Sequence, residues 1–164
     1  MAEIIQSPHK ILRSISKEVI KEEIQSEKIK KVILDMKNAL HKEDDGVAIA
    51  APQIDVPLRI FIVSKKVDQK KYEDDLIFIN PTITKLSKKK EAMSEGCLSV
   101  RWKYGLVKRS TTATVKALNE KGNEFVMSAK GLMAQIFQHE VDHLNGVLFI
   151  DKATNVEDLP PEKK

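Results

Sequence analysis

The sequence of 164 residues contains a single cysteine, few aromatic residues and no long hydrophobic run. The lone cysteine, Cys97, excludes an intrachain disulfide, so nothing in the sequence requires an oxidising compartment. No window approaches the roughly 20 apolar residues that a membrane-spanning helix needs. The N-terminus also lacks the pattern of a signal peptide. We therefore expect a cytoplasmic protein that does not associate with membranes.

Composition and charge restrict the possible structure and function of the chain less strongly. Aromatic residues make up only 5% of the chain, so the core must be built from Ile, Leu, Val and Met. The formal net charge of +4 is too small and too dispersed to predict binding to DNA or other nucleic acids. The densest basic run, residues 88–90, is interpreted as a solvated loop. The length fits one compact domain.

The spacing of apolar residues predicts two helices. The first is amphipathic, with apolar positions Ile29, Val32, Ile33, Met36 and Leu40. Ser26 is placed to cap its start, and Asp44-Asp45-Gly46 ends it. The second runs from about residue 130 to 145, and Gly146 follows as a stop. Its apolar positions are Met133, Ile136, Phe137, Val141 and Leu144.

Short apolar runs predict strands at residues 59–63, 76–79 and 82–86, and a hairpin of residues 112–118 and 124–128. Residues 148–150 are expected to form another short strand. The order of elements predicts an α+β fold, in which the second helix packs among short, mainly antiparallel strands. We expect a single domain over residues 1–151, followed by a short, polar and loose tail over residues 152–164.

The second predicted helix carries the sequence His139-Glu140-Val141-Asp142-His143. Residues four apart lie on one face of a helix, so both imidazoles can bind one metal ion from a single rigid element. Glu140 lies beside the first ligand, where a carboxylate can serve as general base. The alternative is a surface helix that carries two histidines by chance. His9 in a turn and His41 at a helix end are interpreted as exposed or capping residues.

A catalytic metal site usually has three protein ligands and one open position. One class of proteins with this motif places a third histidine six residues after His143, but that position holds Phe149. The later carboxylates, such as Glu157 and Glu162, lie in a proline-containing tail. Cys97 is the favoured third ligand because a thiolate binds borderline-soft metals strongly. The alternative for Cys97 is a buried small hydrophobic residue.

A third segment, Gly46–Gln53, is rich in small residues that let the backbone pass close to a ligand. The side-chain amide of Gln53 could donate a hydrogen bond to a developing oxyanion. Taken alone, this segment is better explained as a packed alanine-rich stretch.

Together, these segments resemble the peptide deformylase family. The family motifs Gly-x-Gly-Leu-Ala-Ala-Pro-Gln, Glu-Gly-Cys-Leu-Ser and Gln-His-Glu-x-Asp-His-Leu correspond to residues 46–53, 95–99 and 138–144, in the same order. Residues 8–13 and 148–151 resemble the two ends of the family domain, so the resemblance covers nearly the whole chain. The sequence departs from the family at four places, which hold Ala48, Ile49, Arg101 and Tyr104.

The resemblance implies a metal-dependent hydrolase that removes the formyl group from the N-terminal N-formylmethionine of newly made proteins and releases formate. Glu140 would be the general base, and the Gln53 amide and the backbone N–H of Leu98 would stabilise the oxyanion. The implied metal ligands are Cys97, His139 and His143. One divalent ion per chain is expected, Fe²⁺ by family and Zn²⁺ as the alternative.

The resemblance also implies an apolar slot for the methionine side chain. Leu132 and Ile136 precede His139 by seven and three positions and share its helix face. Met93 and Glu95 are expected near the mouth of the slot. Ordinary core packing explains the same apolar face equally well. Further substrate contacts are expected from Val47, Ala48, Gly96 and Tyr104.

Expected partners are nascent N-formylmethionyl peptides, with transient association with the ribosome. Two alternatives are a general metallopeptidase with the same histidine motif and a non-catalytic, ribosome-associated metal-binding protein. The missing downstream ligand argues against the first, and a site with only three protein ligands argues against the second. A ligating histidine needs an orienting partner. Asp142 paired with Arg109 is one candidate for that role, and an exposed Asp142 is the alternative.

Overall fold

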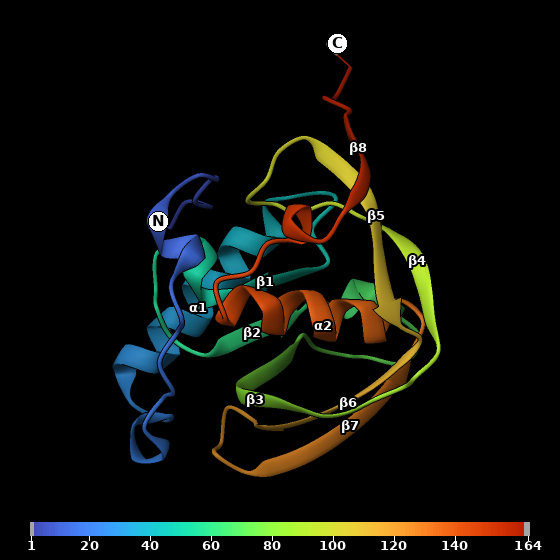
Figure 1. Ribbon diagram of the computed structural model, residues 1–164. Helices are drawn as coiled ribbons and strands as arrows, with labels where there is room; N and C mark the ends of the chain where they lie inside the picture. Colours follow the sequence, from blue (N-terminus) through green and yellow to red (C-terminus); the bar gives the residue numbers. More distant parts are fainter. Residues whose placement is uncertain (1, 163–164) are drawn as a thin grey trace.

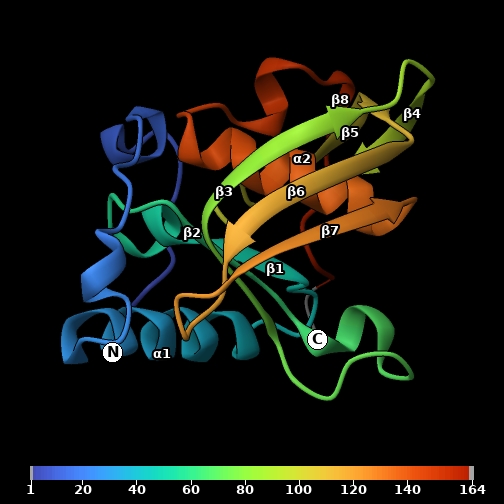
Figure 2. The same ribbon diagram turned by 90° about the horizontal axis from the view of Figure 1, so that it is seen from below.

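The computed structural model describes residues 2–162, so residues 1, 163 and 164 of the predicted domain and tail lie outside the described part. Helix α2, Leu132–Leu144, lies at the centre of the molecule between two antiparallel sheets (Figure 1). Helix α1, Glu27–His41, packs on the opposite face of the larger sheet (Figure 2). The α+β fold predicted from the sequence is confirmed.

The larger sheet has the strand order β1-β2-β3-β6-β7, and every neighbouring pair is antiparallel. The bounds in that order are Ala48–Ala50, Ile60–Val63, Leu76–Leu86, Thr112–Leu118 and Glu124–Lys130. The hairpin and the strand near residue 60 are therefore confirmed. The two strands predicted on either side of Pro81 form the single strand β3, because a register shift between Ile79 and Thr82 absorbs the proline as an irregularity.

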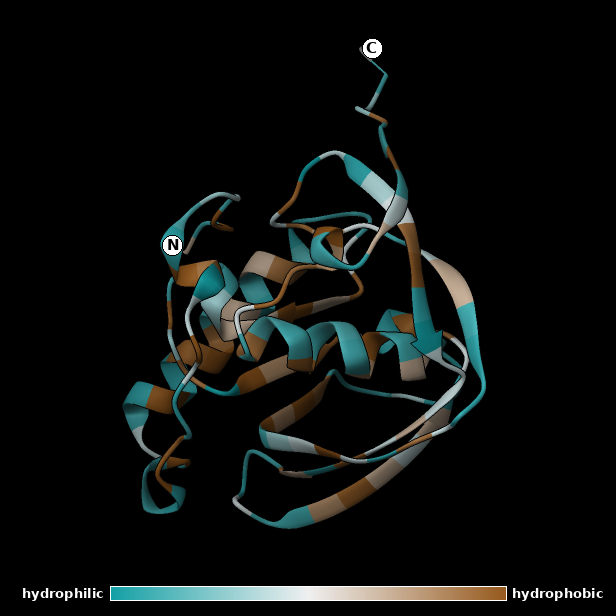
Figure 3. Cartoon of the chain, in the orientation of Figure 1, coloured by the Kyte–Doolittle hydropathy of each residue, from teal (hydrophilic) through white to brown (hydrophobic). Residues whose placement is uncertain are grey.

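Strand β2 is buried on both of its faces. Ile60 and Ile62 pack in the core that includes α1, whereas Phe61 and Val63 pack in the core that includes α2. Phe61 also stacks on Phe78 of β3, with ring centroids 4.4 Å apart. Since alternate residues face opposite sides of a strand, burial on both sides requires a continuous apolar run. Figure 3 shows this contrast, with β2 apolar and the outer strand β4 mostly hydrophilic.

The smaller sheet has the antiparallel order β4-β5-β8. Its strands are Lys90–Glu95, Lys103–Ser110 and Thr154–Asp158. The expectation of a loose tail is wrong for residues 154–158, because this segment pairs with β5 and Lys103 lies opposite Asp158. All residues of β8 are exposed, so no apolar pattern could mark it as a strand.

Both predicted helices are confirmed. The Ser26 side chain accepts a hydrogen bond from the Ile29 N–H at 3.3 Å and caps α1, which ends at His41. Helix α2 ends at Leu144, two residues before Gly146 in the left-handed region at φ 75°. Within residues 2–162, neither helix has the length and apolar character that crossing a bilayer requires.

Short 3₁₀ turns connect several of these elements. They cover Lys10–Arg13, Lys21–Glu23, Ala51–Ile54, Lys65–Asp68 and Phe149–Asp151. The last one replaces the strand predicted at residues 148–150, and that prediction is wrong. The Asp151 N–H donates to the Leu148 carbonyl, and the Leu148 N–H donates to the Asp151 carboxylate, each at 3.0 Å. These local bonds close a turn instead of pairing with another strand.

Candidate active site

Helix α2 presents three polar side chains, His139, Glu140 and His143, toward the segment that follows β4. Cys97 lies two residues beyond β4, and its Sγ is 3.2 Å from Nε2 of His143. The potential ligand atoms of Cys97, His139 and His143 all lie within 4.8 Å of one another. The fold therefore brings together the three residues that the sequence singled out as ligands, although Cys97 is far from the histidines along the chain.

The donor set fits a divalent transition-metal ion. One thiolate and two imidazoles suit Zn²⁺ or Fe²⁺, and three protein ligands leave one coordination position open, as in catalytic sites. Nδ1 of His139 is bonded to Glu95 at 2.7 Å, which leaves Nε2 available to an ion. Burial lowers the pKa of His143 well below its usual value, which favours the neutral ring, whereas bonds to Cys97 and Glu95 outweigh burial and raise the pKa of His139.

Glu95, the last residue of β4, is buried and holds His139 in place. Its carboxylate accepts hydrogen bonds from His139 Nδ1 at 2.7 Å and from Arg109 at 2.7 and 2.8 Å. Arg109 also donates to Asp142 at 2.8 Å, which confirms the expected pair. Burial alone would raise the pKa of Glu95, but the bonds from Arg109 and His139 outweigh it and hold that pKa at about 2. Glu95 therefore holds the His139 ring in place, and it also lines the pocket where it was expected.

The Glu140 side chain is almost completely buried beside the candidate ligands. Its Oε1 lies 3.9 Å from Nε2 of His139. Its Oε2 has no hydrogen-bond partner among residues 2–162. Burial raises the pKa of Glu140 to about 7, and the nearby His139 opposes that rise. A buried carboxyl group with one unpaired oxygen and this pKa is suited to exchange a proton near neutral pH.

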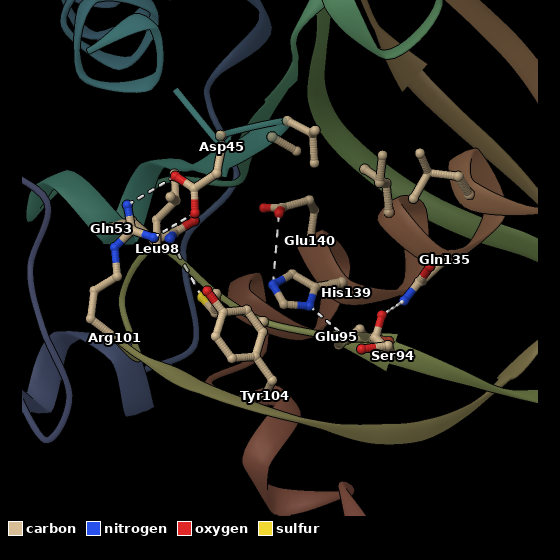
Figure 4. Close-up of a pocket in the computed structure, with 17 residues that line it drawn as sticks. Asp45, Gln53, Ser94, Glu95, Leu98, Arg101, Tyr104, Gln135, His139 and Glu140 are labelled. Atoms are coloured by element: carbon tan, nitrogen blue, oxygen red, sulfur yellow. Dashed lines mark hydrogen bonds and ion pairs between the residues drawn. The ribbon is translucent and has the colours of Figure 1, made fainter. Parts of the chain in front are cut away.

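Gln53 reaches the same site from the 3₁₀ turn after β1 (Figure 4). Its Oε1 accepts a hydrogen bond from the Ala50 N–H at 2.9 Å, which fixes the orientation of the amide. Its Nε2 donates to Ser99 Oγ at 3.0 Å and lies 3.7 Å from Cys97 Sγ. Leu98, directly after Cys97, lines the same pocket. Both groups that the sequence suggested as oxyanion donors therefore lie beside the thiol.

The pocket beside these residues has a volume of about 320 Å³. Its lining includes most of the predicted substrate contacts, namely Val47, Ala48, Glu95, Gly96, Tyr104, Leu132 and Ile136. Leu132 is half exposed, whereas Ile136 is buried, so the apolar side chains extend from the surface toward the ligands.

Met93 does not belong to the pocket lining found within residues 2–162, which corrects its predicted place. It precedes Glu95 by two residues on β4, which places it about 6.6 Å away along the strand. Sequence reasoning missed Gln135, which does line the pocket and whose Nε2 donates to the Ser94 carbonyl at 2.9 Å. Its position on the same helix face as Leu132 and His139 was the signal that could have identified it.

Tyr104 of β5 packs directly over Gly96. A Cβ atom on Gly96 would lie 2.6 Å from the Tyr104 ring, so this approach requires glycine.

The remaining histidines lie outside the pocket, as expected. His9 accepts a hydrogen bond from the Ile11 N–H, and His41 Nε2 lies 2.7 Å from an Asp75 oxygen.

Comparisons with known proteins agree with this geometry. The polypeptide deformylase family model matches residues 1–158. Peptide deformylase 2 of Clostridium acetobutylicum is 36% identical over 154 residues, which cover 94% of this chain and 96% of that protein. A peptide deformylase structure from Legionella pneumophila superposes with a TM-score of 0.85 at 35% identity, covering 94% of this chain and 87% of that one. A class I type b peptide deformylase from Acinetobacter baumannii, solved with Met-Ala-Ser bound, gives a TM-score of 0.84 at 31% identity over 93% and 99% of the two chains. This chain therefore belongs to the peptide deformylase family, whose metal-dependent enzymes remove the formyl group from N-terminal formylmethionine.

Proposed function

We propose that this pocket hydrolyses the formamide of N-formylmethionyl peptides, with Cys97, His139 and His143 as metal ligands and Glu140 as general base. The main support is the buried Glu140 carboxylate beside three ligand atoms that lie within 4.8 Å of one another. A bound divalent ion would supply Lewis acidity to the formyl carbonyl and to a water molecule.

Glu140 moves the proton in this reaction. Its unpaired Oε2 accepts a proton from the attacking water, and the protonated carboxyl then donates it to the leaving nitrogen. The new C–O bond forms at the formyl carbon, the C–N bond breaks, and formate and a free amine are released. A pKa of about 7 suits both halves of the transfer, because the group can accept and return a proton at neutral pH.

Gln53 and Leu98 stabilise the charge that develops on the formyl oxygen. The Ala50 N–H holds Oε1 of Gln53, so its NH₂ group faces the thiol side of the pocket. The backbone N–H of Leu98 adds a second donor on the same side. Loss of one such donor typically raises the barrier by about 3 kcal/mol.

Leu132 and Ile136 form the slot for the methionine side chain, since they supply the apolar part of the lining next to His139. Val47 and Ala48 lie at β1, the edge strand of the larger sheet, where an extended peptide can pair with the backbone. The Acinetobacter baumannii relative with bound Met-Ala-Ser supports a peptide ligand of this kind.

We propose Fe²⁺ as the native ion and Zn²⁺ as the alternative, because thiolate and imidazole ligands suit both. The substrates are nascent chains, so we also propose transient association with the ribosome in the cytoplasm.

The test measures formate released from formyl-Met-Ala-Ser together with metal content. We expect the wild type to release formate with one metal per chain, and Glu140→Ala to lower kcat about 100-fold or more while it still binds metal. Glu120→Ala, at an exposed glutamate in the β6–β7 turn, is the matched control. A metal-loaded wild type that releases no formate would contradict the proposal. Cleavage of casein would instead support a general metallopeptidase.

A further inference from the structure

Arg101 joins the two walls of the pocket at one end. It lies between β4 and β5, in the segment that follows Cys97, and its guanidinium donates to Asp45 at 2.8 and 3.2 Å and to Glu43 at 2.8 Å. Both carboxylates belong to the loop between α1 and β1. Figure 4 shows Arg101 and Asp45 across the pocket from Gln135.

The Arg101 side chain is held from several directions. Its guanidinium carbon lies 4.2 Å from the centroid of the Trp102 ring, and only 17% of the side chain is exposed. Its backbone N–H donates to Gln6 Oε1 at 3.3 Å. A guanidinium that bonds two carboxylates and stacks on an aromatic ring loses little further freedom when a peptide binds, so it can act as a fixed link.

The loop that Arg101 holds leads directly into β1. Asp45 is followed by Gly46 and Val47, and β1 begins at Ala48. The apolar slot lies on the α2 side of the pocket, around Leu132. A peptide whose methionine occupies that slot and whose backbone pairs with β1 therefore extends its later residues toward the end of the pocket where Arg101 and Asp45 lie.

We propose that Arg101 is a positioning residue. Through Asp45 and Glu43 it fixes the loop that leads into β1, and it thereby sets the affinity for the peptide residues that follow methionine. This inference rests on the proposed function for the nature of the peptide. Arg101 is also one of the residues at which the sequence departs from the family motifs.

The experiment compares formyl-Met-Ala-Ser with N-formylmethionine amide, which has no residue after methionine. Arg101→Leu should raise KM for the tripeptide about three- to tenfold and change KM for the amide less than twofold. Asp45→Asn should act in the same direction, and the double variant should be no worse than Arg101→Leu alone. Arg101→Lys, which keeps the charge, should recover part of the loss. Arg13→Leu breaks another arginine–aspartate pair outside the pocket and is the matched control.

Calorimetric binding of Met-Ala-Ser requires no turnover and tests the same link. We expect a higher Kd for Arg101→Leu than for the wild type and no change for Arg13→Leu. Equal losses for both substrates, additive losses in the double variant, or an unchanged Kd would each overturn the proposal. A wild type that binds Met-Ala-Ser more tightly than Arg101→Leu does and yet releases no formate would contradict only the proposed function. If Arg101→Leu does not fold, Arg101→Lys and Asp45→Asn carry the comparison.

Discussion

Replacement of Glu95 by glutamine should weaken both the fold and the retention of metal, because one buried carboxylate serves two partners. Its oxygens bond Arg109 at 2.7 and 2.8 Å and His139 at 2.7 Å. The Glu95 and Arg109 side chains are only 4% and 3% exposed, so solvent screens their interaction little. A pKa of about 2 in place of 4.5 corresponds to about 3 kcal/mol of stabilisation at neutral pH. This agrees with the loss of about 3–5 kcal/mol that is typical when one partner of a buried ion pair is removed.

Glutamine keeps the shape of the side chain and can still form hydrogen bonds, so we expect Glu95→Gln to lose about 2–3 kcal/mol in urea unfolding. His139 also loses the carboxylate that orients it, and metal affinity should fall about 10- to 100-fold in competition with a chelator. Glu91→Gln is the matched control, because Glu91 lies on the same strand with a side chain that is 57% exposed beside Lys89. Unchanged unfolding and unchanged metal affinity in Glu95→Gln would refute the role assigned to this network.

Three other perturbations follow from the structure. Ile136→Trp should fill the slot and raise KM for formyl-Met peptides, and an unchanged rate with unchanged side-chain preference would count against the slot. Gly96→Ala should displace the Tyr104 ring, which would lie 2.6 Å from the new Cβ, so thermal unfolding should show a loss of about 1–3 kcal/mol. The hydrogen bond from Arg13 lowers the pKa of Asp151, so its contribution to stability is present at neutral pH and is lost as the pH falls through that lowered pKa. Asp151→Asn should therefore unfold at a lower temperature than the wild type at pH 7, and the difference should shrink below about pH 4.

The clustering of Cys97, His139 and His143 could be predicted from the sequence because most of the information for it is local. His139 and His143 are four residues apart, and helical geometry alone places their side chains on one face. The two histidines supply only two ligands, so a third must come from elsewhere in the chain. Cys97 is the one residue in the chain that can offer a thiolate. The same locality explains why β2 and the β6–β7 hairpin could be predicted, since apolar runs and a polar turn mark them directly.

The smaller sheet could not be predicted because its strands depend on distant partners. The residues of β4 are mostly hydrophilic, and β8 is exposed along its whole length. The pairing of β8 with β5 joins Lys103 to Asp158, which are 55 residues apart. The orienting partner of His139 was missed for the same reason, because Glu95 lies 44 residues earlier and no local pattern connects the two.

Arg109 explains how such distant segments reach a common geometry. From β5, its guanidinium bonds Glu95 at the end of β4 and Asp142 on α2. Cys97 follows Glu95 by two residues, and Asp142 lies between His139 and His143 on the helix. One buried side chain therefore sets the distance between the strand that leads to the thiol and the helix that carries the imidazoles. Because a buried arginine is stable only when its carboxylate partners are in place, the fold that satisfies this charge also assembles the ligand set.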